Sequence, residues 1–238
     1  MDRTPNAARR PQLNRARVLA AAVELADRTG IEALSMRGLA QELGVVPMAL
    51  YKHVANKEEL LDGMVEAVVG EIGPPTGGAD WQAAVRGRVL AARAALLRHP
   101  WASRAIESRT RPTPAMLSHL DSVAGLFLAG GVSADLTHHA MHALGSRVWG
   151  FTQELFPAPP TDPAAQAAAE AAQAATAAQL QAMAAHFPHL AAIVAARSHD
   201  PGSVVGGGCD DAFEFEFALD VLLDGFARLH RAGWTSAH

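Results

Sequence analysis

Several residues that follow Gly44 have side chains suited to contact with an external polyanion. The candidate contact residues on one short segment and at the start of the helix after it are Pro47, Met48, Ala49, Tyr51, Lys52, His53 and Lys57. Lysine, histidine and tyrosine side chains bind backbone phosphates, while small apolar groups fit against base methyl groups in the major groove. The pattern therefore predicts a nucleic-acid contact in which the first three residues meet base edges and the last four hold phosphates.

Two short helices around one glycine would position these residues. Ser35 stands at a cap position before apolar residues at helical spacing, which predicts a helix over residues 36–43 that ends at Gly44. The next segment begins with a proline, whose missing N–H costs nothing in a first turn, and buries Leu50 and Val54 at i and i+4. This arrangement predicts a helix-turn-helix.

Three neighbouring segments resemble the TetR family of one-component transcriptional regulators, over about the first 70 residues. They read Leu39-Ala-Gln-Glu-Leu-Gly-Val45, Ala49-Leu-Tyr-Lys-His-Val54 and Asn56-Lys-Glu-Glu-Leu-Leu61. The resemblance implies a ligand-responsive DNA-binding regulator, most often a repressor, in which Arg37 would reach a guanine edge as the matching arginine does in the tetracycline repressors. The alternative is an enzyme or small-molecule carrier that contains a helical pair and does not bind DNA.

Composition favours an all-α protein. Of the 238 residues, 50% are hydrophobic but only 5% are aromatic, so Ala and Leu, both strong helix formers, supply most of the apolar side chains. No segment alternates apolar and polar residues as a strand would. No run of about 18 apolar residues and no apolar signal segment occur, so we expect a cytoplasmic protein that does not enter a membrane.

Charge is distributed unevenly along the chain. The net charge is −4, yet residues 1–60 hold nine Lys and Arg against seven Asp and Glu, whereas the remainder holds eleven against seventeen. Several of the basic residues precede residue 18 and could form an arm that contacts phosphates or the minor groove. A solvated tail is the alternative for such scattered arginines.

Breaks in the helical pattern predict the domain organisation. Residues 1–56 would form the N-terminal arm and a three-helix helix-turn-helix domain, residues 57–72 a connecting helix, and residues 80–238 a ligand-binding and dimerisation domain. In the last of these we expect helices over 80–98, 111–129, 133–155 and 211–231, and a short helix or turn over 101–109. Residues 158–208 include an Ala-rich, partly flexible segment, and its part 158–185 is either a mobile cover or a lid over a pocket.

Two of these helices are more apolar than one contact requires. Residues 133–155 and 211–231 would pack against the same pair in a second subunit as a four-helix bundle. Such a twofold homodimer presents two recognition helices to successive major grooves, which a palindromic operator would match.

Aromatic and histidine residues in a domain otherwise built of Ala and Leu indicate an effector pocket. The candidate lining is Trp101, Ile106, Met116, Leu120, His138, His142, Trp149 and Gln153. A mostly apolar lining with a few polar groups suits a small, bulky and largely apolar organic molecule. Each side chain taken singly could instead fill the domain core.

The last helix and the segments 109–113 and 145–154 also resemble the regulatory domain of the tetracycline repressor subgroup. By position, Thr110 and Glu154 are kept as ligand-binding residues. Ile106 stands where a metal-binding histidine belongs, Gly73 replaces a drug-binding histidine, and Arg88 and Val123 replace two amides. A magnesium–tetracycline chelate is therefore not expected, and neither a cofactor nor a metal is predicted.

Other residues with reactive side chains lack the neighbouring groups that catalysis requires. His138 and His142 have the i, i+4 spacing of metal ligands, but no third ligand is evident, and solvent-facing or pocket-lining histidines are the alternative. Cys209 has no basic neighbour and no partner for a disulfide. No nucleophile elbow or phosphate-binding glycine motif occurs, so the protein is not expected to be an enzyme.

Overall fold

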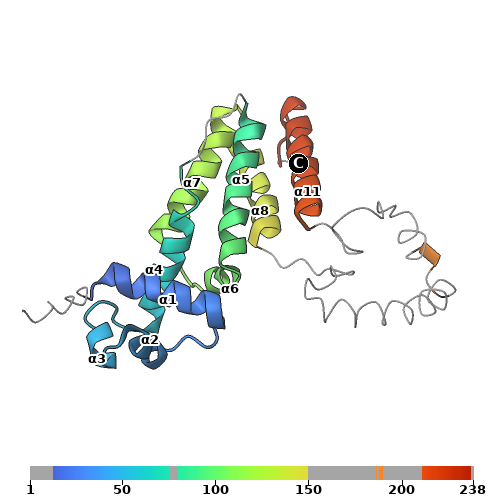
Figure 1. Cartoon of the computed structure of the whole chain (residues 1–238). Coiled ribbons are helices and arrows are strands. Elements are labelled where there is room, and N and C mark those ends of the chain that lie inside the picture. The colour runs from blue at the N-terminus through green and yellow to red at the C-terminus, as the bar shows by residue number, and fades with distance from the viewer. Residues whose placement is uncertain (1–12, 75–79, 150–185, 187, 190–210, 237–238) are drawn as a thin grey trace, which may run out of the picture. The chain divides into compact units, whose positions relative to one another are not determined.

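The computed structural model describes residues 13–74, 80–149, 186, 188–189 and 211–236, and all regular structure in these ranges is helical (Figure 1). The helices that these ranges contain are α1 Arg15–Thr29, α2 Met36–Leu43, α3 Pro47–Leu50, α4 Lys57–Gly70, α5 Trp81–Arg98, α6 Ala102–Glu107, α7 Pro114–Ala129, α8 Ala134–Trp149 and α11 Asp211–Arg231. The predicted all-α fold is confirmed.

The described residues divide into two units, which are treated separately. One comprises residues 13–149 together with 219–236, and the other comprises the described residues between 151 and 218. The predicted continuation of α8 to Leu155, the Ala-rich segment 158–185 and the N-terminal arm before residue 13 lie outside the described residues. No helix of the described chain is both long and apolar enough to cross a bilayer.

Side-chain caps fix where the helices begin, as the sequence predicts. Ser35 Oγ accepts the N–H of Gly38 at 3.1 Å, and Asn56 Oδ1 accepts that of Glu59 at 2.8 Å. Asp80 Oδ1 likewise accepts the N–H of Ala83 at 2.8 Å. Each bond satisfies one of the backbone donors that a helix start leaves without an intrahelical acceptor. Gly44 ends α2 in the left-handed region, with φ 65°.

The first four helices enclose a small core. Its largest fully buried side chains are Val18, Leu34, Leu39, Leu50, Val54, Leu60, Met64, Val65 and Val68. Helix α1 packs against both α2 and α4, and α2 packs against α3 (Figure 1). Because α3 has only four residues, its position depends on Leu50 and Val54 being anchored in this core rather than on its own hydrogen bonds.

The longer helices form the rest of this unit. Helix α7 packs against α5, α8 and α4, and α5 also contacts α4 and α8 (Figure 1). The carboxyl-terminal part of α11 joins them: the rings of Phe226 and Phe127 meet edge to face at 6.3 Å, and Arg86 Nε lies 2.7 Å from Asp220 Oδ1. Phe127 is fully buried, so this packing belongs to the core.

Gly63 sets how closely α1 and α4 approach. A Cβ atom at this position would lie 2.6 Å from Leu19 Cδ2 and 3.0 Å from Leu19 Cδ1. Leu19 is itself buried in the interface, so it has little room to move away. The two helices are therefore in contact through the backbone of α4.

We expect Gly63→Val to lower the free energy of unfolding by about 1–3 kcal/mol, because the added methyl groups overpack this contact. Gly125→Val in α7 is the matched control, since nothing lies within 4 Å of the Cβ position there. Urea denaturation followed by circular dichroism measures both. Equal stability of the two variants would contradict the close approach.

Candidate DNA interface, interhelical network and ligand cavity

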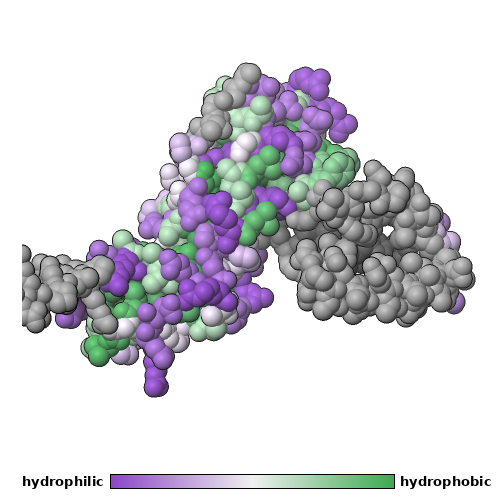
Figure 2. All heavy atoms as spheres, in the orientation of Figure 1, coloured by the Kyte–Doolittle hydropathy of each residue, from purple (hydrophilic) through white to green (hydrophobic). Residues whose placement is uncertain are grey.

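The helix-turn-helix presents an exposed face that mixes apolar and basic side chains. Val46 is 68% exposed and Met48 71% exposed, and Figure 2 shows apolar atoms at the tip formed by α3. The predicted DNA-contacting residues that are exposed are Arg37, Pro47, Met48, Tyr51, Lys52 and Lys57, while Ala49 and His53 are half-buried. Leu50 and Val54 point the opposite way, into the core. The short α3 thus separates an anchored side from an accessible one.

The basic residues of this face differ from those on α1. Arg28 pairs with Glu42 at 2.7 Å and Arg15 approaches Glu59 at 3.9 Å. Within the described residues, Arg37, Lys52 and Lys57 form no ion pair. Their cationic groups are therefore available to an external anion.

A cap at the start of α4 fixes the position of Lys57. Asn56 accepts the N–H of Glu59, and Glu59 Oε2 in turn accepts the N–H of Ala55 at 2.7 Å. This reciprocal arrangement resembles a capping box. It holds the first residue of α4 next to the turn that carries Tyr51 and Lys52.

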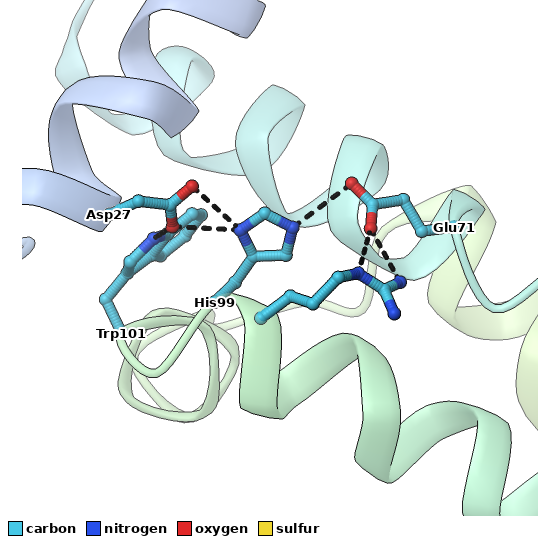
Figure 3. A network of polar contacts seen from close by, with 5 residues as sticks. Asp27, Glu71, His99 and Trp101 are labelled. Atoms are coloured by element: carbon cyan, nitrogen blue, oxygen red, sulfur yellow. Dashed lines mark hydrogen bonds and ion pairs between the residues drawn. The ribbon is translucent and has the colours of Figure 1, made fainter. Parts of the chain in front are cut away.

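A polar network connects α1 to the far ends of α4 and α5 (Figure 3). His99 Nδ1 lies 2.9 Å from Asp27 Oδ1, and His99 Nε2 lies 3.1 Å from Glu71 Oε1. Trp101 Nε1 donates to Asp27 Oδ1 at 2.6 Å, and Arg98 donates to Glu71 Oε2 at 2.8 Å. Neither Asp27 nor Glu71 stands out in the sequence as a partner for the histidine.

Glu71 remains ionised in this network. Partial burial opposes its charge, but hydrogen bonds from Arg98 and the charge and hydrogen bond of His99 outweigh that effect and hold the pKa of Glu71 below its ordinary value. The network therefore links α1 to the segments just after α4 and α5 through charged and hydrogen-bonding side chains.

A cavity lies between α5, α7 and α8. The empty space that these helices enclose is about 350 Å³, and this figure includes space open to solvent. Its lining residues are Val89, Ala92, His119, Leu120, Val123, Met141, Leu144, Gly145 and Val148. His119 is the one titratable side chain among them, so the cavity is apolar with a single polar wall.

The residues predicted to bind a ligand fall in different places. Leu120 lines the cavity, and Met116 is buried one turn earlier on α7. Trp101 instead bonds to Asp27, and Ile106 is half-buried against the core that contains α1 to α4. Thr110 is exposed. The structure therefore does not gather the predicted set around this cavity.

The histidines of α8 lie away from the cavity lining. His138 and His142 are exposed in the single chain, with ring centroids 4.6 Å apart. In the part of the chain that the structure describes, no group of three or more His, Cys, Asp or Glu could hold a metal ion. The side chain of Trp149 and all of Gln153 and Glu154 lie outside what the structure describes.

His119 is the functional candidate that sequence reasoning missed. It is buried on α7, and burial together with the nearby positive charge of Arg88 lowers its pKa to about 4. The available signal was its position on the apolar stripe of α7, three residues from Met116 and four from Val123. At neutral pH this wall of the cavity is an uncharged imidazole.

The lowered pKa predicts how stability depends on pH. Above about pH 6.5 neither state protonates His119, whereas between pH 6.5 and 4 the unfolded chain binds the proton and the folded chain does not. Stability is thus lost as the pH falls, and the urea midpoint should drop more between pH 7.5 and 5 in the wild type than in His119→Gln. Identical drops would show that His119 is protonated equally in both states.

Two family models match this chain. One, described as "Bacterial regulatory proteins, tetR family", matches residues 18–64, and the other, "Tetracyclin repressor-like, C-terminal domain", matches residues 74–229. The first match contains the helix-turn-helix and most of α4. The second contains the helices that enclose the cavity.

Curated relatives are regulators by name. An HTH-type transcriptional regulator of Saccharopolyspora erythraea is 37% identical over 129 residues, which are 53% of this chain and 55% of the relative. The HTH-type transcriptional repressor DrrR1 of Streptomyces coeruleorubidus is 36% identical over 133 residues, 55% of this chain and 49% of the relative. The Escherichia coli tetracycline repressor protein class D is 41% identical over 91 residues, which are 37% of this chain and 42% of the relative. The chain spans about half the length of the curated relatives it matches.

Solved structures agree over a longer range. The crystal structure of a possible TetR family transcriptional regulator from Streptomyces coelicolor A3(2) is similar with a TM-score of 0.66 and 29% identity, covering 91% of this chain and 100% of that one. Apo ActR from the same organism has the same fold, with a TM-score of 0.68 and 24% identity over 93% and 98% of the two chains. Together with the family model that covers more than half of its residues, this shows that the chain belongs to the TetR family of bacterial regulatory proteins.

Proposed function

We propose that this chain is a homodimeric repressor that binds a palindromic operator and is released from it by a small, largely apolar organic molecule. The observation that carries the proposal is the exposed face of α2, α3 and the start of α4, whose cations are unpaired within the described residues and whose opposite side is anchored in a core. Regulatory relatives at 36–41% identity support it.

Contacts with DNA would follow from the chemistry of this face. Arg37 would reach a guanine edge, because a guanidinium matches the two acceptors that guanine presents in the major groove. Pro47, Met48 and Ala49 would meet base methyl groups. The remaining contacts would hold phosphates through Tyr51, Lys52, His53 and Lys57.

Replacement of Lys57 tests this docking. Lys57→Ala should weaken binding to operator and to unrelated DNA about equally and reduce the salt dependence by about one unit, because one phosphate contact is lost. Fluorescence anisotropy with duplexes from the neighbouring genomic region, at several salt concentrations, measures both effects. Arg111→Ala is the control, since it removes one exposed positive charge outside the helix-turn-helix. A change in sequence preference caused by Lys57→Ala would show that the docking is wrong.

The dimer would use α11 together with α8. Three side chains of α11 are largely exposed in the single chain: Phe213 at 62%, Phe217 at 58% and Val221 at 55%. The rings of Phe213 and Phe217 stack with their centroids 6.3 Å apart. An exposed apolar stripe of this kind is typical of an interaction surface. Pairing of α8 and α11 with their copies as a four-helix bundle would cover it.

Two phenylalanines of α11 should behave differently when truncated. Phe226→Ala should lower the free energy of unfolding by about 3 kcal/mol, because Phe226 packs on Phe127 in the core. Phe217→Ala should instead weaken the dimer and, with it, operator affinity, because its ring is exposed in the single chain. Sedimentation separates the two effects, and a wild-type monomer that binds DNA at micromolar concentration would rule out the dimer.

The effector would enter the cavity between α5, α7 and α8. A ligand that favours one of two packings of these helices changes operator affinity by the same factor by which the operator changes ligand affinity. No magnesium would be required, because Ile106 stands where the tetracycline repressors place a metal-binding histidine. Release of DNA only when magnesium is present would contradict this part of the proposal.

A further inference from the structure

Arg88 is a buried cation for which the described residues supply no anion. Its side chain lies on α5 with the residue only 7% exposed, and it takes part in no ion pair in the described ranges. One terminal nitrogen donates to the backbone carbonyls of Ile72 and Gly73, and Nε has no hydrogen-bond partner among the described residues. Burial lowers the pKa of Arg88. Buried charges in proteins are normally paired, so this one is suited to a partner from outside the chain.

Arg88 is not itself a lining residue of the cavity, but it lies beside it on α5. It precedes Val89 and lies four residues before Ala92, both of which line the cavity, and i, i+4 residues share a helix face. From α7, His119 lines the same cavity and lies near enough to Arg88 for the guanidinium charge to depress its pKa. A positive charge therefore lies near the one polar wall of an otherwise apolar cavity.

We propose that the effector is an organic anion, an apolar ring system bearing a carboxylate, and that Arg88 binds the carboxylate while the ring system fills the cavity. This inference rests on the proposed function, since it names the chemical class of ligand for the same cavity. A planar guanidinium is suited to a carboxylate because it offers parallel N–H donors in a fork. The ligand thus supplies the negative charge that the described residues lack, and the neutral imidazole of His119 supplies a further hydrogen-bonding group.

The same arginine connects the ligand to α4. Ile72 and Gly73 follow directly after the end of this helix, and Lys57 begins it at the proposed DNA face. A carboxylate competes with these carbonyls for the guanidinium, and a charged acceptor forms the stronger hydrogen bond. Ligand binding would thereby loosen the hold of α5 on the end of α4, so Arg88 both recognises the anion and transmits its presence.

A matched pair of probes tests the charge requirement with the purified full chain. Calorimetric titration with 2-naphthoate and with 2-naphthamide compares two ligands of nearly equal size that differ in charge. The wild type should bind the carboxylate at least about tenfold more tightly, as expected for a charge-assisted hydrogen bond. Arg88→Gln should abolish that preference, whereas Arg93→Gln, on the same helix, should retain it. Equal affinity for both probes, or no binding of either at millimolar concentration, would overturn the inference.

Further measurements distinguish a variant that no longer recognises the carboxylate from a variant that no longer folds. Arg88→Lys keeps the charge and should retain part of the preference, and circular dichroism reports whether each variant is folded. The NMR-detected pKa of His119 should rise in Arg88→Gln and also when naphthoate binds the wild type, because a positive neighbour is removed or neutralised. An unchanged His119 pKa on naphthoate binding would overturn the proposed location even if the carboxylate binds.

Operator binding is measured separately for the wild type and Arg88→Gln, so failure of the ligand inference cannot be mistaken for failure of the proposed function. Both proteins should bind operator without ligand, and naphthoate should weaken only the wild-type complex. A wild type that prefers naphthoate but binds no DNA would disprove the repressor and leave the anion site standing. A wild type that binds operator without preferring the carboxylate would disprove the anion site alone.

Discussion

The contact of His99 with two carboxylates at once is the interaction on which the arrangement of this unit depends. Its Nδ1 contacts Asp27 and its Nε2 contacts Glu71, so one imidazole ring bridges two carboxylates. The residues come from α1 and from just after α4 and α5, so the network links three helices. Because the ring is buried, solvent screens these interactions less than it screens the exposed pairs on α1.

The parts of the fold that depend on near neighbours in sequence could be predicted. Ser35, Asn56 and Asp80 cap the helices that follow them because the accepting oxygen and the donating N–H are three residues apart. Gly44 ends α2 because a residue without Cβ enters the left-handed region at no steric cost. The resemblance of residues 39–61 to a known family also predicted which side of the helix-turn-helix faces DNA. Helical periodicity alone leaves this open.

Contacts between distant residues could not be predicted in the same way. Asp27 and His99 are 72 positions apart, and nothing in either local sequence indicates the other. Trp101 looked unusual enough to be a pocket residue, yet its indole N–H is held by Asp27 in the same network. The cavity raises a related difficulty, because α7 carries one histidine and α8 carries three. Only the packing of the helices distinguishes the buried His119 from the exposed His138 and His142.

The close packing of α4 on α1 at Gly63 has a mechanical consequence. A helix of 14 residues is about 21 Å long, and the contact with Leu19 lies nearer its beginning than its end. Gly63 is the seventh of the 14 residues, so a tilt about this contact moves two nearly equal halves of α4 in opposite directions. A tilt of about 10° would move the Lys57 end by roughly 1.6 Å, about half of the 3.4 Å rise of one base pair. A tilt that keeps the contact between Gly63 and Leu19 would therefore shift the proposed DNA-facing end of α4 by about half a base-pair step.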